Sequence, residues 1–173
     1  MMSFQITENM PIVRAKFRIG PESLIAMQAY FDKSLEPWPQ AVPKEVEVAA
    51  LIDTGASVTI LDHQLIQRMR HQPRGYCNIS GFDSKSSDQA DATSYPNYEM
   101  GLTLLGATDD DCILDVEAAQ IVGHDIPNKN FSAIIGMDVL AHCNFQLDGP
   151  NQCFDLSSPY AKIKEIRSVK ANS

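Results

Sequence analysis

The chain has 173 residues, of which 44% are hydrophobic and 21% are charged. This length suits a single domain that buries its own core, and the apolar fraction is too high for a disordered chain. No apolar run approaches the roughly 20 residues that a membrane-spanning helix needs. The net charge of −8 disfavours nucleic-acid binding, which requires a concentrated basic surface. We therefore expect a globular protein with neither a nucleic-acid nor a membrane partner.

The cysteines and histidines argue against disulfides and metal sites. Cys77, Cys112, Cys143 and Cys153 are scattered without a C-x-x-C pair, and the N-terminal residues do not resemble a secretory signal. Reduced thiols and a cytoplasmic location are expected. Since the histidines are equally scattered, we expect no metal and no cofactor.

The first 44 residues predict a strand, a helix and a loop. Residues 11–19 alternate apolar and polar side chains, as a half-buried strand does. A helix should begin near Pro21, because proline suits the first helical turn. Its apolar stripe is formed by Leu24, Met27, Phe31 and Leu35. Residues 36–44 contain three prolines and should form a loop.

The middle of the chain predicts a strand, a turn, a second strand and a helix. Residues 45–52 and 56–61 are rich in β-branched and apolar side chains on either side of Thr54-Gly55. Asp62 should cap a short helix over residues 63–70. The polar residues 81–97 lie between apolar segments and predict the tip of a long hairpin.

The last third predicts further strands and a basic end. Residues 112–122 form a strand, residues 131–140 a buried strand entering a short helix, and a hairpin turns at residues 148–150. Residues 160–173 carry a net charge of +3 and should be a solvated end. The chain is thus expected to be mainly β, as a barrel or a sandwich with two or three short helices.

The most informative segment contains Asp53-Thr54-Gly55. A D-T-G tripeptide alone is a weak signal, since it also forms turns in which Asp caps backbone N–H groups and Gly supplies a positive φ. Here Leu51-Ile52 and Ala56 should place the carboxylate beside a buried wall. A carboxylate in such a place is costly unless it is used.

A second segment, residues 133–140, reads A-I-I-G-M-D-V-L. Alone it predicts a core strand running into a helix. The two segments in this order, with a polar hairpin between them, resemble the retropepsin-like aspartic proteases. That family has an apolar-apolar-D-[ST]-G-A catalytic loop, a flap hairpin, and an apolar-apolar-G-x-D-x-L strand-to-helix motif. The likeness covers about residues 45–156 and is closest in style to the cellular and bacterial members.

The resemblance implies a single-domain closed β-barrel of the acid-protease type, with short helices and a flap hairpin. Residues 1–44 would extend this domain, residues 45–156 would be its catalytic part, and residues 157–173 would be a basic tail. The sequence also departs from the family's viral members, which usually have Arg at Met137 and a glycine-rich flap. Here Gly81 is the only glycine of the flap, and Phe82 could cover a substrate.

The resemblance also assigns roles to individual residues. Since the chain has one D-T-G, Asp53 would meet its own copy in a homodimer. Two carboxyls roughly 3 Å apart share one proton, so one can activate a water while the other hydrogen-bonds the oxyanion. The remaining residues would support this dyad: Thr54, Gly55 and Ala56 in the catalytic loop, with Thr54 bonding across the dimer axis, and Ile135, Gly136 and Asp138 behind it.

Three functions remain open from the sequence. The first is a homodimeric aspartic endopeptidase that hydrolyses polypeptides. The second is a non-catalytic dimerisation or peptide-binding module with the same fold, which the atypical flap favours. The third is an unrelated β-barrel binding protein whose D-T-G is only a turn.

Overall fold

The computed structural model describes residues 2–34, 43–79, 93–108 and 111–166. Its strands are β1 (Met2–Gln5), β2 (Ile12–Ile19), β3 (Glu45–Ile52), β4 (Ile60–Asp62), β5 (Gly75–Ile79), β6 (Thr93–Leu105), β7 (Cys112–His124), β8 (Ala133–Ile135), β9 (Asn144–Asp148), β10 (Cys153–Ser157) and β11 (Lys162–Ile166). Its helices are α1 (Pro21–Ser34), α2 (His63–Arg68) and α3 (Met137–Leu140). Within these described ranges, no helix has the length and apolar character to cross a membrane.

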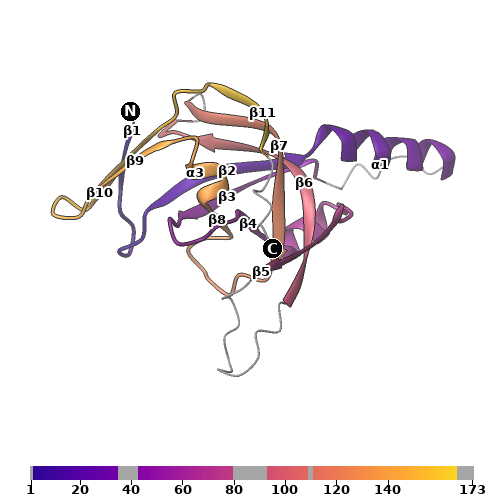
Figure 1. The fold of residues 1–173 in the computed structure, drawn as a ribbon, viewed down its shortest axis with the longest axis horizontal. Coiled ribbons are helices and arrows are strands. Elements are labelled where there is room, and N and C mark those ends of the chain that lie inside the picture. The colour runs from indigo at the N-terminus through magenta and orange to yellow at the C-terminus, as the bar shows by residue number, and fades with distance from the viewer. Residues whose placement is uncertain (1, 35–42, 80–92, 109–110, 167–173) are drawn as a thin grey trace.

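The main sheet closes on itself. Its strand order is β11-β7-β4-β8-β3-β2-β6-β5, and β7 also pairs with β6. The ring β7-β4-β8-β3-β2-β6 is therefore a barrel of six strands with parallel and antiparallel pairs, while β5 and β11 extend it (Figure 1). The predicted fold class, mainly β with a closed barrel and short helices, is confirmed.

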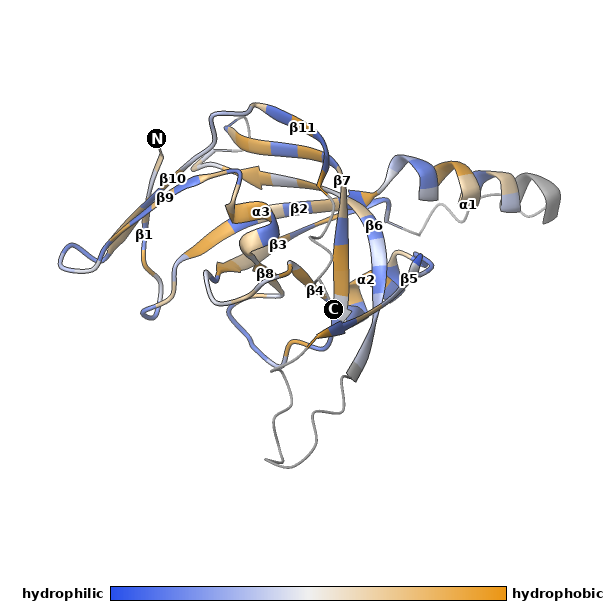
Figure 2. Ribbon diagram, in the orientation of Figure 1, coloured by the Kyte–Doolittle hydropathy of each residue, from blue (hydrophilic) through white to orange (hydrophobic). Residues whose placement is uncertain are grey.

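The barrel closes around side chains that alternate along its strands. In β2, Val13, Ala15, Phe17 and Ile19 are buried while the residues between them are partly exposed. Figure 2 shows apolar residues concentrated along the barrel strands. Burying a large apolar side chain of this kind contributes about 1.5–3 kcal/mol, so the barrel interior is the main source of stability.

A smaller sheet, β1-β10-β9, lies beside the barrel (Figure 1). The N-terminal strand pairs with the C-terminal hairpin, with Met2 opposite Leu156. The Phe4 ring stacks on the Phe154 ring at a centroid distance of 5.1 Å. The hairpin is the predicted one, but β1 was not predicted, because four residues are too few to show a period.

The C-terminal segment differs from the prediction of a solvated end. Its residues 162–166 form β11, which pairs in parallel with β7. Ile166 is buried at 5% exposure, and the Lys162 ammonium contacts the Glu117 carboxylate at 2.6 Å. Pairing with β7 places Lys162 opposite Asp115 and beside Glu117, so basic side chains of this segment lie next to acidic ones.

Two further segments depart from the expectation or lie outside the description. The arm predicted over residues 56–61 is a strand only at Ile60–Asp62, because the residues before it fold over the start of α3. The hairpin formed by β5 and β6 is described at its base, where Gly75 lies opposite Asn97 and Ile79 opposite Thr93. Its tip, with the predicted flap residues Gly81 and Phe82, lies outside the described residues, as does most of the Pro-rich loop.

Candidate active site

The D-T-G loop leaves the barrel at the same edge as the second motif. β3 and β8 are parallel neighbours, with Ile52 opposite Ile135. The residues that follow them, Asp53 and Gly136, therefore leave the sheet together. The Asp53 N–H donates to the Ile135 carbonyl at 3.1 Å, which fixes the first residue of the loop against the second motif.

The Asp53 carboxylate is held by its own loop. The Gly55 N–H donates to Asp53 Oδ1 at 2.8 Å, and the Ala56 N–H donates to the Asp53 carbonyl at 3.2 Å. Asp53 is only partly buried, and Thr54 and Gly55 are exposed. The turn thus orients the carboxylate while leaving it open to a water, a substrate or a second chain.

A buried hydroxyl joins the two motifs. Thr59, which is fully buried, donates from Oγ1 to Asp138 Oδ1 at 2.7 Å, and its N–H donates to Asp138 Oδ2 at 2.9 Å. The same Oγ1 accepts the Gly136 N–H at 3.1 Å. One side chain therefore connects the end of the D-T-G loop to both the glycine and the aspartate of the second motif.

Gly136 lies where a side chain would not fit. A Cβ built at this position would be 2.4 Å from the Val58 carbonyl oxygen and 2.9 Å from the Val58 nitrogen. These are backbone atoms, so the contact cannot be relieved by a side-chain rotation. The next residue, Met137, donates its N–H to the Ala56 carbonyl at 2.8 Å. The loop over residues 53–59 consequently packs directly on the start of α3.

The electrostatics of Asp138 suit a positioning role. Burial raises the pKa of Asp138, while the hydrogen bonds from Thr59 and from the Val139 N–H act in the opposite direction. Both of its oxygens are used within the chain, which leaves Asp53 as the accessible carboxylate of the site. Within the described parts of the chain, no group of three His, Cys, Asp or Glu side chains could hold a metal ion.

An apolar cluster connects this loop with the hairpin base. It is built on Ile60, Tyr95, Val122, Phe131 and Ile134, and the partly buried Ala56, Val58, Cys77 and Ile79 pack against it. Ala56 and Val58 come from the D-T-G loop, whereas Cys77 and Ile79 come from β5. The base of the hairpin therefore lies on the same side of the barrel as the D-T-G loop.

The structure brings together nearly all of the predicted site residues. Those of the two motifs meet at one end of the barrel: Asp53, Thr54, Gly55, Ala56, Ile135, Gly136 and Asp138. Gly81 and Phe82 lie outside the described residues. Sequence reasoning missed Thr59, although a hydroxyl between Val58 and Ile60 on an apolar strand must find a partner when buried, and this could have drawn attention to it.

Comparison with known proteins gives a likeness of fold. No family model matches the sequence, and no curated protein sequence matches it. Among solved structures, the chain is similar to a crystal structure of a retropepsin-like aspartic protease from Rickettsia conorii. The identity is 12% and the TM-score 0.43, over 90% of this chain and 88% of that chain. At this identity and TM-score the match assigns no role to any residue, and the residue roles proposed below rest on contacts within this chain.

Proposed function

We propose that this protein is an aspartic endopeptidase that acts as a homodimer, with one Asp53 from each protomer. The observation that carries the proposal is the partly exposed Asp53 carboxylate, oriented by the Gly55 N–H and anchored to the second motif through the Thr59–Asp138–Gly136 contacts.

One protomer supplies half of the chemistry. A single carboxyl cannot be general acid and general base in the same step, so two copies must meet. When they share one proton, the ionised Asp53 takes a proton from water as the water oxygen attacks the peptide carbonyl. The protonated Asp53 of the other copy hydrogen-bonds the developing oxyanion. The proton taken from water then passes from the first Asp53 to the nitrogen of the leaving amine, and the C–N bond breaks.

A polypeptide is the substrate that this arrangement favours. The partly buried Ala56, Val58, Cys77 and Ile79, which pack on the apolar cluster, offer a wall for side chains, and β5 lies at the edge of the main sheet beside it. An extended peptide lying along such a hairpin can add backbone hydrogen bonds to those of its side-chain contacts.

The test is hydrolysis of a peptide library by Asp53→Asn beside the wild type. Asparagine supplies neither the charge nor the proton, so we expect a loss of about 100-fold or more, typical for a missing general acid–base. Asp125→Asn, an exposed carboxylate outside the site, is the matched control and should keep the wild-type rate.

Two outcomes would contradict the proposal. If Asp53→Asn retains turnover within a factor of about ten, Asp53 is not the catalytic group. If the wild type forms a stable dimer and binds peptides without cleaving any, the fold serves as a non-catalytic peptide-binding module instead.

A further inference from the structure

Five exposed residues of the D-T-G loop and α3 carry no charge. They are Thr54, Gly55 and Ser57 of the loop, Met137 at the start of α3, and Ala141, which follows the end of α3. We refer to these five residues as the α3 surface. Charged residues make up 21% of the chain, and the centres of protein interfaces are depleted in charge, so this surface has the composition of a contact site.

The α3 surface is continuous and adjoins Asp53. Met137 and Ala141 are four positions apart, which places them on one side of α3, and the Ala141 N–H donates to the Met137 carbonyl at 3.0 Å. The Met137 N–H donates to the Ala56 carbonyl at 2.8 Å, and Ser57 follows Ala56 directly. The loop that carries Asp53 and the outer side of α3 therefore form one area of the molecule.

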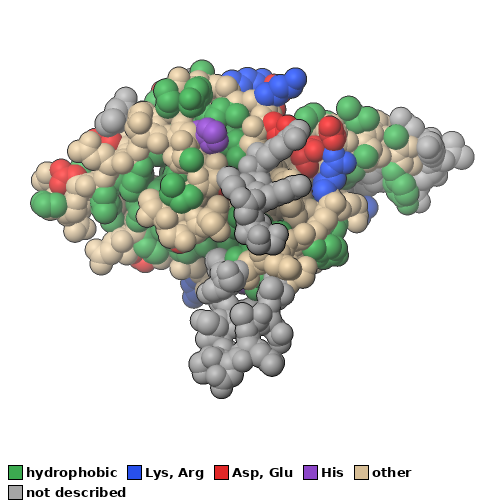
Figure 3. Space-filling model, viewed as in Figure 1, with side chains coloured by type: hydrophobic (Ala, Val, Ile, Leu, Met, Phe, Trp, Pro, Cys, Tyr) green, Lys and Arg blue, Asp and Glu red, His purple; other side chains and the backbone are tan. Residues whose placement is uncertain are grey.

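A large apolar side chain lies near each end of α3, Met137 with 42% exposure and Tyr160 with 53%. The Tyr160 ring lies edge-on to the His142 ring at a centroid distance of 6.3 Å. The Ser158 hydroxyl donates to the His142 carbonyl at 2.8 Å and accepts the Tyr160 N–H at 3.1 Å, which holds Tyr160 beside α3. Figure 3 shows mainly hydrophobic and uncharged side chains over α3, whereas charged ones gather where α1 leaves the barrel. Exposed apolar side chains gathered in this way are typical of an interaction site.

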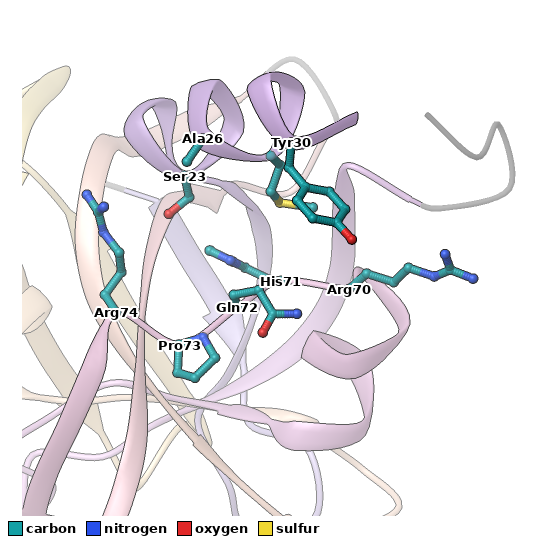
Figure 4. Close-up of a pocket in the computed structure, with 9 residues that line it drawn as sticks. Ser23, Ala26, Tyr30, Arg70, His71, Gln72, Pro73 and Arg74 are labelled. Atoms are coloured by element: carbon teal, nitrogen blue, oxygen red, sulfur yellow. The ribbon is translucent and has the colours of Figure 1, made fainter. Parts of the chain in front are cut away.

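Exposed apolar side chains also occur on α1, which borders a cavity of about 590 Å³ between itself and residues 70–74 (Figure 4). Ile25 is 71% exposed and Tyr30 is 67% exposed. Arg70 and Arg74 line the same cavity, so this area carries charged side chains as well. The residues of the Asp53 site do not line it. A contact through α1 would therefore not by itself complete a pair of Asp53 carboxyls.

We propose that the α3 surface is where two copies of the chain meet, with Met137 of each copy buried against the other. The inference rests on the proposed function, in which Asp53 must meet its own copy across a two-fold axis. A two-fold contact uses the same surface on both copies, so the area that adjoins Asp53 faces itself. Each copy carries a net charge of −8, and a contact surface without charged side chains limits the repulsion between the copies.

The test is sedimentation equilibrium of the full chain, which measures the dimer dissociation constant independently of activity. Met137→Lys places like charges on both copies at the contact, so we expect this constant to rise about tenfold or more. Met137→Leu keeps an apolar side chain of similar volume and should keep the constant close to that of the wild type. Ile25→Lys, at a more exposed apolar position on α1, is the matched control and should leave the constant unchanged.

The salt dependence of the wild-type dimer provides a second measurement. An apolar contact between two anionic copies tightens as salt screens their repulsion, so the dissociation constant should fall between about 0.05 and 0.5 M NaCl. A contact held by ion pairs would weaken over the same range. Ala141→Lys, on the same side of α3, repeats the first test if circular dichroism shows that Met137→Lys does not fold.

The inference is overturned if Met137→Lys dimerises like the wild type, if Ile25→Lys dissociates as readily as Met137→Lys, or if the wild-type dimer weakens as salt rises. A wild type that stays monomeric overturns it as well. The endopeptidase proposal can fail separately. A wild-type dimer that Met137→Lys dissociates, but that cleaves no peptide, supports the contact through the α3 surface and contradicts only the proposed chemistry.

Discussion

At the scale of single residues, the candidate active site depends on a threonine that is not part of either motif. The Thr59 hydroxyl accepts one hydrogen bond and donates another, and the Thr59 N–H donates a further one to Asp138. The hydroxyl hydrogen-bonds to both Gly136 and Asp138, and this joins the D-T-G loop to the second motif. Asp53 acts on a substrate in our proposal, and Thr59 acts through its effect on Asp53.

We predict that Thr59→Val lowers both stability and activity. Valine keeps the shape but leaves the Gly136 N–H unpaired and removes one of the two hydrogen bonds that Asp138 Oδ1 accepts, which costs about 1–3 kcal/mol of unfolding free energy. Thr59→Ser keeps the hydroxyl and loses a methyl group, so it should cost about 1 kcal/mol or less. Urea unfolding and peptide hydrolysis measure the two effects.

The serine variant separates a positioning role from simple packing. If the hydroxyl positions Asp53, Thr59→Ser keeps a kcat close to that of the wild type while Thr59→Val lowers it. Equal kcat for both variants would show that only the packing of this side chain matters.

At the scale of elements, α1 is fastened to the barrel through Glu99 of β6. This residue contacts Gly20 and Ser23 at the start of α1, and also His71 and Arg74 from the segment after α2. His71 packs edge-on against the Tyr98 ring at a centroid distance of 5.5 Å. The junction is therefore sensitive to the protonation of a buried imidazole.

We predict that this junction makes the fold less stable in mild acid. Burial lowers the pKa of folded His71, with Arg74 acting in the same direction and Glu99 in the opposite one, whereas the unfolded residue titrates near 6.5. As pH falls through that value the unfolded chain binds a proton first, so stability is lost below about pH 6.5 and retained above it.

The comparison of wild type with His71→Gln isolates this effect. Glutamine does not titrate and keeps a donor for the Glu99 carbonyl. Urea unfolding at pH 7.5 and at pH 5.5 should therefore show a larger loss for the wild type than for the variant. Parallel losses would assign the acid sensitivity to other groups.

The C-terminal strand provides the second test at this scale. β11 lies against β7 and buries Ile166. Ile166→Ala should lower the unfolding free energy by about 2 kcal/mol or more, as expected for a core truncation. Lys164→Ala, exposed on the same strand, should change it by less than about 0.5 kcal/mol. If both variants unfold like the wild type, β11 does not stabilise the barrel.

At the scale of the whole molecule, the chain holds one D-T-G, whose Asp53 carboxylate is partly exposed. Our proposal therefore makes the monomer inactive. Specific activity should fall on dilution near the dimer dissociation constant, because the monomer has no second Asp53. Activity measured over a dilution series, with sedimentation at the same concentrations, checks this.

The variant Thr54→Ala provides a second test of whether activity requires a dimer. Thr54 is exposed on the loop and supplies a hydroxyl that could bond to its copy across the two-fold axis. Losing such a hydrogen bond lowers the free energy of dimerisation by about 0.5–1.5 kcal/mol, and the loss occurs once for each of the two copies. The variant should lose activity at a higher concentration than the wild type while matching it when concentrated. Constant specific activity down to a monomeric solution would exclude the dimer mechanism.

The sequence by itself determined the local features of this protein. Alternation in residues 11–19 predicted β2, Pro21 predicted the start of α1, and Asp62 predicted the cap of α2, because each depends on neighbours along the chain. The two motifs were also recognisable, since a turn and a strand-to-helix junction each fit within nine residues.

Only the tertiary structure decided how distant segments meet. The parallel pairing of β3 with β8 places Asp53 beside Gly136, and the fold of the loop brings Thr59 to Asp138. The same holds for β1 on β10, for β11 on β7, and for the cavity between α1 and His71. Such contacts join residues tens of positions apart, and their stability comes from burial and closure of the whole barrel rather than from any local pattern.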